Sequence, residues 1–175
     1  TVFHSGMAGI ITKMDGTAAT NAMSFQNGYG QIGRIQVSGT TTSYITSSDY
    51  RLKENVVEIT NGIDRVKLLN PSRFNFISDS DITVDGFLAH EVQEVVPEAI
   101  AGAKDATKEE EYEVTPAVLD DDGNVVTEAV MGTRTVPDYQ GIDQSKLVPL
   151  LTAALQEAIT KIEALEARVT ALENA

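Results

Sequence analysis

Residues 46–55 read Thr-Ser-Ser-Asp-Tyr-Arg-Leu-Lys-Glu-Asn, and the character of the chain changes at this stretch. The sequence before it is rich in Gly, Ser and Thr, whereas the sequence after it is mixed, charged and ends in a helical repeat. Ser48 and Lys53 stand five residues apart. A serine becomes a nucleophile when a base takes its proton, and a lysine can be that base once burial or a nearby cation lowers its pKa. The spacing alone equally fits a serine that caps a turn beside a solvated lysine.

Two further motifs give the stretch a context. Residues 86–93 read Gly-Phe-Leu-Ala-His-Glu-Val-Gln, and residues 145–151 read Ser-Lys-Leu-Val-Pro-Leu-Leu. Together with residues 48–55, they resemble the intramolecular chaperone domain at the C-terminus of phage tail fibres and tailspikes, the peptidase S74 family. The resemblance runs from about residue 40 to the end of the chain.

The resemblance implies a self-cleaving chaperone. Members of the family trimerise, help a triple-stranded β fibre to fold, and then cut themselves off between the serine and the aspartate of the first motif. Carried over, the scissile bond is Ser48–Asp49 and the enzyme is a single-turnover serine peptidase of the Ser-Lys type. The implied catalytic residues are Ser48 and Lys53, and the candidate supporting residues are His90, Arg51 and Ser47.

The implied organisation is an α+β homotrimer in two segments. Residues 1–48 are expected to be the end of a β-rich fibre stem that is retained after cleavage. Residues 49–175 are expected to be the released chaperone domain, a small mixed α/β body with a hairpin arm and a parallel coiled-coil helix at 145–175. The partners implied are two further copies and the upstream fibre of the same polypeptide, in a tail fibre or spike precursor assembled in the host cytoplasm. Since the sequence begins at Thr1, we expect it to be a piece of a longer chain.

The first 47 residues show no helical period and are punctuated by glycine. Runs such as 9–12 and 34–38 read as short strands between turns. Isolated strands of this kind bury too little apolar surface to be stable, so we expect three copies to share a core. A disordered linker is the alternative. The lone His4 is interpreted as a surface or stem residue.

The body is predicted from short apolar patterns. A helix is expected after an N-cap at Thr60 or Asn61 and is expected to end before Pro71. Strands are predicted at 72–77 and 83–88 with a turn at 78–81, followed by a helix at 89–96. On that helix His90 either forms an ordinary i, i+4 pair with Glu94 or supports the cleavage site.

A hairpin is predicted between residues 112 and 136, because Asp122-Gly123 supplies a favoured turn between two apolar pairs. The acids around this turn fail the spacing of a calcium loop, and no metal or other cofactor is expected. The resemblance suggests that the hairpin is an arm wrapped around the fibre. The acidic segment 105–122 is interpreted either as a solvated surface or as an arm that touches a basic client.

The C-terminal region carries a heptad repeat, with Ser145 as the expected N-cap. The apolar a and d positions are Val148, Leu151, Leu155, Ala158, Ile162, Leu165, Val169 and Leu172. Charges at the g and e positions place Lys161 opposite Glu166 of a neighbour, and Arg168 opposite Glu173, which favours parallel helices. The alternative is that the helix packs only onto its own domain.

The amino-acid composition argues against several classes of partner and site. A net charge of −13 argues against nucleic acid or an anionic membrane as partner, since both bind clustered Lys and Arg. The chain has no cysteine, so no disulfide framework or thiolate metal site is possible. No apolar run approaches the roughly 20 residues of a membrane-spanning helix.

The chemistry of the cut has an obstacle. Attack by Ser48 on its own carbonyl would close a strained four-membered ring. Three routes remain: Ser48 attacks the bond of a neighbouring chain, Lys53 activates a water held by Ser48, or the Asp49 carboxylate attacks the preceding carbonyl. All three need a fixed geometry, so we expect cleavage to require the assembled trimer.

A trimeric fibre tip or receptor-binding end that is never cut is the competing function, and a bacterial adhesin that uses the same segment is a third.

Overall fold

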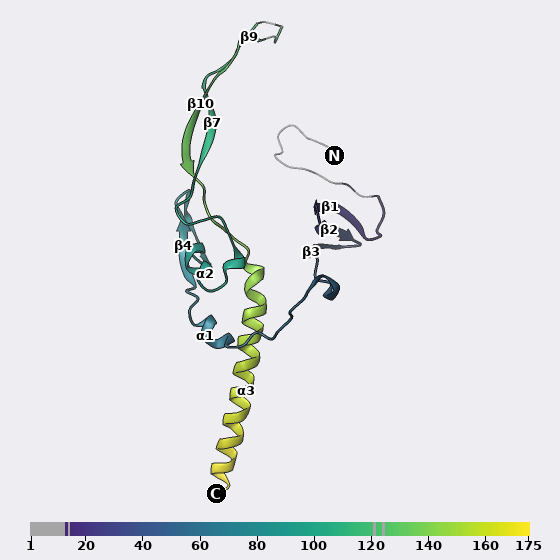
Figure 1. The fold of residues 1–175 in the computed structure, drawn as a ribbon, viewed down its shortest axis with the longest axis vertical. Coiled ribbons are helices and arrows are strands. Elements are labelled where there is room, and N and C mark those ends of the chain that lie inside the picture. The colour runs from purple at the N-terminus through teal and green to yellow at the C-terminus, as the bar shows by residue number, and fades with distance from the viewer. Residues whose placement is uncertain (1–12, 14, 121, 124) are drawn as a thin grey trace. The chain divides into compact units, whose positions relative to one another are not determined.

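The computed structural model describes residues 13, 15–120, 122–123 and 125–175, which fall into two compact units, one ending at Val57 and one beginning at Glu58. The mixture of strands and helices agrees with the expected α+β class (Figure 1). The strand expected at 9–12 and His4 lie outside the described residues. No helix in the described part of the chain is long and apolar enough to span a membrane.

The first unit is a three-stranded antiparallel meander followed by one turn of helix. Two-residue connections, Gly28-Tyr29 and Gly39-Thr40, join its strands, and Gly39 adopts the left-handed conformation with φ 54°. The strand predicted at 34–38 is the second half of the central strand. The elements are β1 (Thr20–Asn27), β2 (Gly30–Ser38), β3 (Thr41–Thr46) and the 3-10 helix η1 (Tyr50–Leu52).

The second unit is an assembly of small sheets and short helices on one long helix. Its first elements are α1 (Gly62–Val66), β4 (Ser72–Phe76), β5 (Asp79–Gly86), α2 (Ala89–Gln93), η2 (Pro97–Ala99) and β6 (Ile100–Ala101). They are followed by β7 (Thr107–Thr115), β8 (Val118–Leu119), β9 (Val125–Thr127), β10 (Val130–Pro137), β11 (Gly141–Ile142), η3 (Gln144–Leu147) and α3 (Val148–Glu173). Within the described residues of this unit the strands form four two-stranded antiparallel sheets: β4–β5, β6–β11, β7–β10 and β8–β9.

The core of the second unit is small and lies where α2, η2 and the start of α3 meet. Its buried side chains are Val92, Val96, Ala99, Leu147 and Leu150, of which Val92 and Val96 are only 1% exposed. Residues from α1, β6 and β11 pack around them. The helix predicted at 89–96 ends early, at Gln93, but the residues that follow it still enter the core.

Helix α1 is shorter than predicted and is capped in a different way. Asn61 has φ 55° and makes no side-chain capping bond, so neither expected N-cap residue caps the helix. Instead Glu157 of α3 accepts the backbone N–H of Ile63 at 3.1 Å. A carboxylate from a distant helix therefore satisfies a donor that the local sequence leaves open.

The hairpin prediction is correct, and its two faces differ. β7 pairs with β10 in a register that sets Tyr112 opposite Gly132, and every residue of β7 is exposed. One face holds the Glu110–Arg134 ion pair, with Arg134 5.2 Å above the Tyr112 ring. Glu109, Glu111 and Glu113 alternate onto the other face. Asp121 and Asn124 of the expected turn lie outside the described residues, while Gly123 donates to the Asp120 carbonyl.

Other local predictions need correction. The turn expected at 78–81 lies at Ile77-Ser78, because Asn75 bonds to Ser80 and Thr83 and the ladder starts already at Asp79. The expected N-cap Ser145 is itself held by Asp143, which caps η3 through the Ser145 backbone N–H at 3.0 Å.

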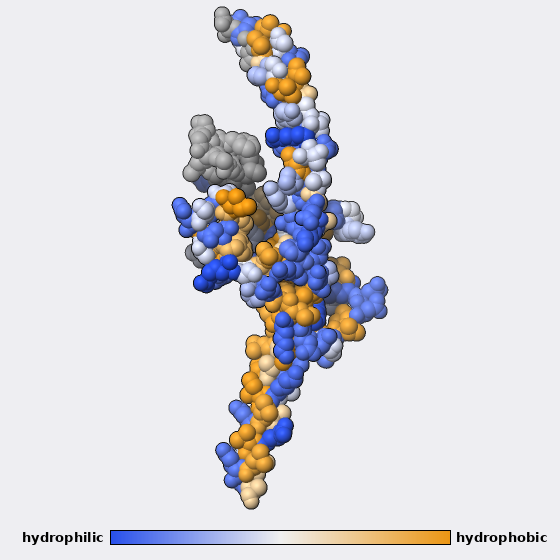
Figure 2. Space-filling model, turned by 90° about the vertical axis from the view of Figure 1, so that its left-hand side faces the viewer, coloured by the Kyte–Doolittle hydropathy of each residue, from blue (hydrophilic) through white to orange (hydrophobic). Residues whose placement is uncertain are grey.

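Helix α3 presents two different stripes. Leu150 and Ala154 are buried, and Glu157 reaches α1, so this stripe packs on the body of its own chain. The expected a and d residues lie on a neighbouring stripe. Ala158 among them is half-buried, whereas the larger side chains Leu151, Leu155, Ile162, Leu165, Val169 and Leu172 are between 46% and 76% exposed. Figure 2 shows hydrophobic side chains gathered along one side of the free, C-terminal part of this helix. The alternative of packing onto its own domain is therefore true of one stripe only.

We predict that Gly62→Ala destabilises the second unit by about 1–3 kcal/mol. A Cβ at Gly62 would lie 2.6 Å from the backbone nitrogen of Ala154, so α1 and α3 would have to separate. Thermal unfolding of the chain measures the effect. Gly141→Ala is the control, since its Cβ would meet nothing within 4 Å. Equal melting temperatures for the two variants would contradict the close contact between α1 and α3.

Candidate functional site

The candidate site begins where β3 ends, and its first residue is fixed to the sheet. The Ser47 backbone N–H donates to the Ile32 carbonyl at 3.2 Å, and its hydroxyl donates to the Gln31 carbonyl at 3.1 Å. Ser47 thus continues the pairing of β3 with β2 by one residue. Its hydroxyl is engaged with the backbone of the neighbouring strand.

The next residues form the single turn of η1. Asp49 caps this turn by accepting the backbone N–H of Arg51 at 2.9 Å. At the other end the Lys53 backbone N–H donates to the Tyr50 carbonyl at 3.1 Å. The turn reverses the chain, so that Lys53 comes back toward the serine that precedes the turn.

The Lys53 ammonium donates to the Ser48 hydroxyl, with 2.7 Å between Nζ and Oγ. The two residues expected to act together are therefore in direct contact. Lys53 is brought to Ser48, while Ser47 points its hydroxyl to β2. The two adjacent serines, which the sequence does not distinguish, thus have different hydroxyl partners in the structure.

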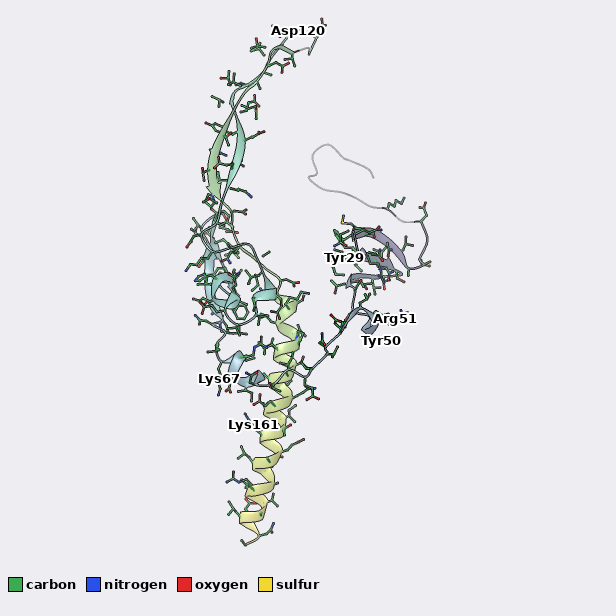
Figure 3. The ribbon with its side chains drawn as sticks, in the orientation of Figure 1. Tyr29, Tyr50, Arg51, Lys67, Asp120 and Lys161 are labelled. Carbon is green, nitrogen blue, oxygen red and sulfur yellow. The ribbon has the colours of Figure 1, made fainter. Side chains whose placement is uncertain are left out.

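Asp49 and Arg51 form a second pair across the same turn. Arg51 Nε donates to Asp49 Oδ1 at 2.9 Å, and Nη2 donates to Oδ2 at 2.7 Å. These side-chain hydrogen bonds, followed by the Arg51 backbone N–H, hold the pKa of Asp49 below its ordinary value. Figure 3 labels Arg51 and Tyr50 on this turn. The bidentate geometry was not anticipated from the sequence, although an acid two residues before an arginine is the signal that allows it.

The site is open to solvent in a single chain. Every residue from 46 to 61 is exposed. Burial or a nearby cation is what converts a lysine into a base, and the described single chain gives Lys53 no burial. The chain thus supplies the Ser48–Lys53 contact but no described element that shields it from water.

His90 belongs to the other unit. It lies half-buried on α2, and no ion pair joins it to Glu94 within the described ranges. The simple i, i+4 pair is therefore not formed. A supporting role for His90 at the cleavage site stays a prediction.

We predict that the Asp49 carboxyl titrates below an ordinary aspartate and that Arg51→Ala raises its pKa toward the usual range, since the guanidinium is lost and only the backbone N–H of residue 51 remains as donor. The pair is complete above the ordinary carboxyl pKa and opens as the pH falls through the lowered value. Carboxyl carbon shifts followed by NMR across the acid range, in a Ser48→Ala background, measure both values. Arg73→Ala is the reciprocal control, because it removes the matching pair on Asp85 and leaves Asp49 unchanged. An Asp49 titration that is indifferent to Arg51→Ala would contradict the pairing.

Comparison with known families gives a match that starts at the candidate serine. Residues 48–101 match the model of the Peptidase S74 family, described as chaperone of endosialidase. A comparison with curated proteins finds no match. The matched segment contains Ser48, Asp49, Arg51, Lys53 and His90, and it excludes Ser47. The resemblance expected from the sequence is confirmed for this segment.

Proposed function

With residues 48–101 in the Peptidase S74 chaperone family, we propose that the chain is an intramolecular chaperone that releases itself by cutting the Ser48–Asp49 bond. Residues 1–48 would stay with the fibre and residues 49–175 would leave. The observation that carries the proposal is the 2.7 Å contact between Lys53 Nζ and Ser48 Oγ, directly beside the bond to be cut. The match begins at the same serine.

The proposed reaction is hydrolysis. Lys53 must first lose a proton to solvent and become a neutral amine. Ser48 or a water held by it then attacks the carbonyl carbon of a Ser48 residue, and the Lys53 amine takes the proton of the attacking hydroxyl. Lys53 then returns the proton to the Asp49 nitrogen as the C–N bond breaks. One water is consumed, leaving a new carboxyl on Ser48 and a new amino group on Asp49. When Ser48 is the nucleophile, it belongs to a neighbouring chain and an ester forms first, which avoids the four-membered ring.

The geometry disfavours the third route, attack by Asp49. Both oxygens of that carboxylate accept hydrogen bonds from Arg51, two residues further along the chain. A carboxylate held by a guanidinium is stabilised as an anion and is a weaker nucleophile. Ser48 and Lys53 remain as the acting pair in the two routes that are left.

Assembly into a trimer is part of the proposal. The open stripe of α3 follows the a and d positions of a parallel coiled coil, while the neighbouring stripe already serves the chain's own core. In the single chain Lys161 pairs with Glu157 one turn back, at 2.7 Å. An assembled trimer would offer Lys161 a second acid, Glu166 of a neighbour, as the heptad register predicts. The exposure of residues 46–61 fits a cleavage site that is shielded only after copies meet.

The client we propose is the β-fibre of the same polypeptide, in a tail fibre or spike precursor. The exposed β7–β10 hairpin offers it an extended two-stranded surface with one acidic face. The exposed apolar side chains of the three-stranded sheet, Met23, Phe25 and Ile32 among them, fit strands that other copies cover. The same exposed surfaces would also fit the alternative of a trimeric fibre tip that is never cut.

We predict that the freshly made chain yields two masses, corresponding to residues 1–48 and 49–175. Intact-mass spectrometry should find only the full-length chain for Ser48→Ala and for Lys53→Ala. Lys67→Ala is the matched control, since Lys67 is an exposed lysine of the other unit. A full-length parent, or a Ser48→Ala variant that is still cut, would overturn the proposal and favour the uncut fibre tip.

We further predict that Leu155→Glu with Ile162→Glu converts three associated chains into one, because charges would enter the open stripe of α3. Light scattering of these variants in the Ser48→Ala background gives the number of chains. The control places the same two charges off the stripe, as Thr160→Glu with Ala167→Glu. With Ser48 restored, the single-chain variant should also lose the cut. A monomeric variant that is cut at the parent rate would refute the need for assembly.

A further inference from the structure

The turn between Ser48 and Lys53 must place the Lys53 side chain on the Ser48 hydroxyl, yet few contacts hold the turn in position. Residues 46–61 are all exposed, so side-chain packing within the chain does not fix their conformation. The hydrogen bonds of the segment must do so. One group of hydrogen bonds, which we call the anchor, ties Ser47 to strand β2. A second group, the closure, holds the turn of residues 49–53 together.

The anchor lies on Ser47. Its backbone N–H and its hydroxyl both bond to carbonyls of β2, at 3.2 and 3.1 Å. This fixes the backbone that enters Ser48. It leaves free the rotation of the chain after Ser48, on which the position of Lys53 depends.

The closure centres on Arg51. Its backbone N–H and its Nε both donate to Asp49 Oδ1, and its Nη2 donates to Oδ2. Three of the hydrogen bonds that define the turn therefore join Asp49 to the same residue. The remaining backbone bonds, from Leu52 to Asp49 and from Lys53 to Tyr50, are each 3.1 Å and belong to a turn of only three residues. A helix this short is not stable by its backbone bonds alone.

We propose that Arg51 is the positioning residue of the cut: it holds both oxygens of Asp49, which fixes the turn that sets Lys53 on Ser48 and keeps the carboxylate off the scissile bond. Arg51 touches neither the scissile carbonyl nor the attacking hydroxyl, so its role is exerted through Asp49 and Lys53. This inference rests on the proposed self-cleavage. It adds the reason why a solvent-exposed arginine beside the cut bond matters to the rate.

The test measures how fast the 49–175 fragment appears in chain that is pulse-labelled during cell-free synthesis. Arg51→Ala should slow the cut by about 100-fold, the size of effect expected when a reacting group is misplaced by about an ångström. The cleavage rate of Arg51→Lys should lie between those of the parent chain and of Arg51→Ala, because an ammonium cannot donate two parallel hydrogen bonds to a carboxylate. Added methylguanidinium should speed the cut of Arg51→Ala and leave Lys53→Ala uncut, which a general structural defect would not produce.

The matched control is Arg73→Ala. Arg73 makes the same two-pronged contact with Asp85, at 2.7 and 3.0 Å, and it is as exposed as Arg51. Its removal should leave the rate of the cut unchanged. The melting temperature and the number of associated chains, measured in the Ser48→Ala background, should be the same with Arg51 and with Arg51→Ala, since exposed ion pairs contribute little to stability.

Three outcomes would overturn the inference, and they are distinct. A parent chain that is cut while Arg51→Ala is cut equally fast removes the role of Arg51 and leaves the proposed function standing. A cut in the Ser48→Ala, Arg51→Ala double variant would make the released Asp49 carboxylate the nucleophile, so that Arg51 would restrain the cut instead of positioning it. A parent chain that is never cut would overturn the proposed function and the inference together.

Discussion

The packing of α3 against the body is the contact on which the second unit depends. Leu150 and Ala154 fill one side of the small core, and Gly62 allows α1 to lie directly on the backbone of α3. Glu157 completes this contact by accepting the N–H of Ile63, and Lys161 in turn donates to Glu157 at 2.7 Å. Because α3 uses one stripe for this purpose, its adjacent apolar stripe stays exposed in the single chain.

The single chain therefore buries a small apolar core but leaves other apolar surfaces exposed to solvent. Five of the described side chains form the core cluster, whereas the apolar a and d residues of α3 and many apolar residues of the first unit are exposed. Exposed apolar surface of this extent marks an interaction surface in a stable protein. Ser48 and Lys53 are exposed as well, and their contact forms in the single chain. A proposal in which assembly precedes the cut accounts for both observations with one cause.

The candidate site shows how far residue types alone can lead. The sequence motif indicated Ser48 and Lys53 as a pair, and the structure brings their side chains together at 2.7 Å. It left open which of two adjacent serines matters, because Ser47 and Ser48 are chemically identical. The difference lies in the strand partner of Ser47, which spacing along the chain does not reveal. The role of His90 stays a prediction, since it lies in the other unit.

The sequence by itself determined the resemblance of residues 48–101 to the Peptidase S74 family, the α+β class, the hairpin and the long C-terminal helix. These features follow from motifs, from Asp-Gly turn chemistry and from a heptad period, all of which are encoded by neighbouring residues. It misplaced the N-caps of α1 and of the C-terminal helix, the turn after β4 and the end of α2. Only the tertiary structure decided the cap of α1 and the packing face of α3, because Glu157 caps a helix that lies 94 residues away and Gly62 lets α1 contact the α3 backbone. Local propensity is weak in segments this short, so contacts between distant residues fix where each element begins and ends.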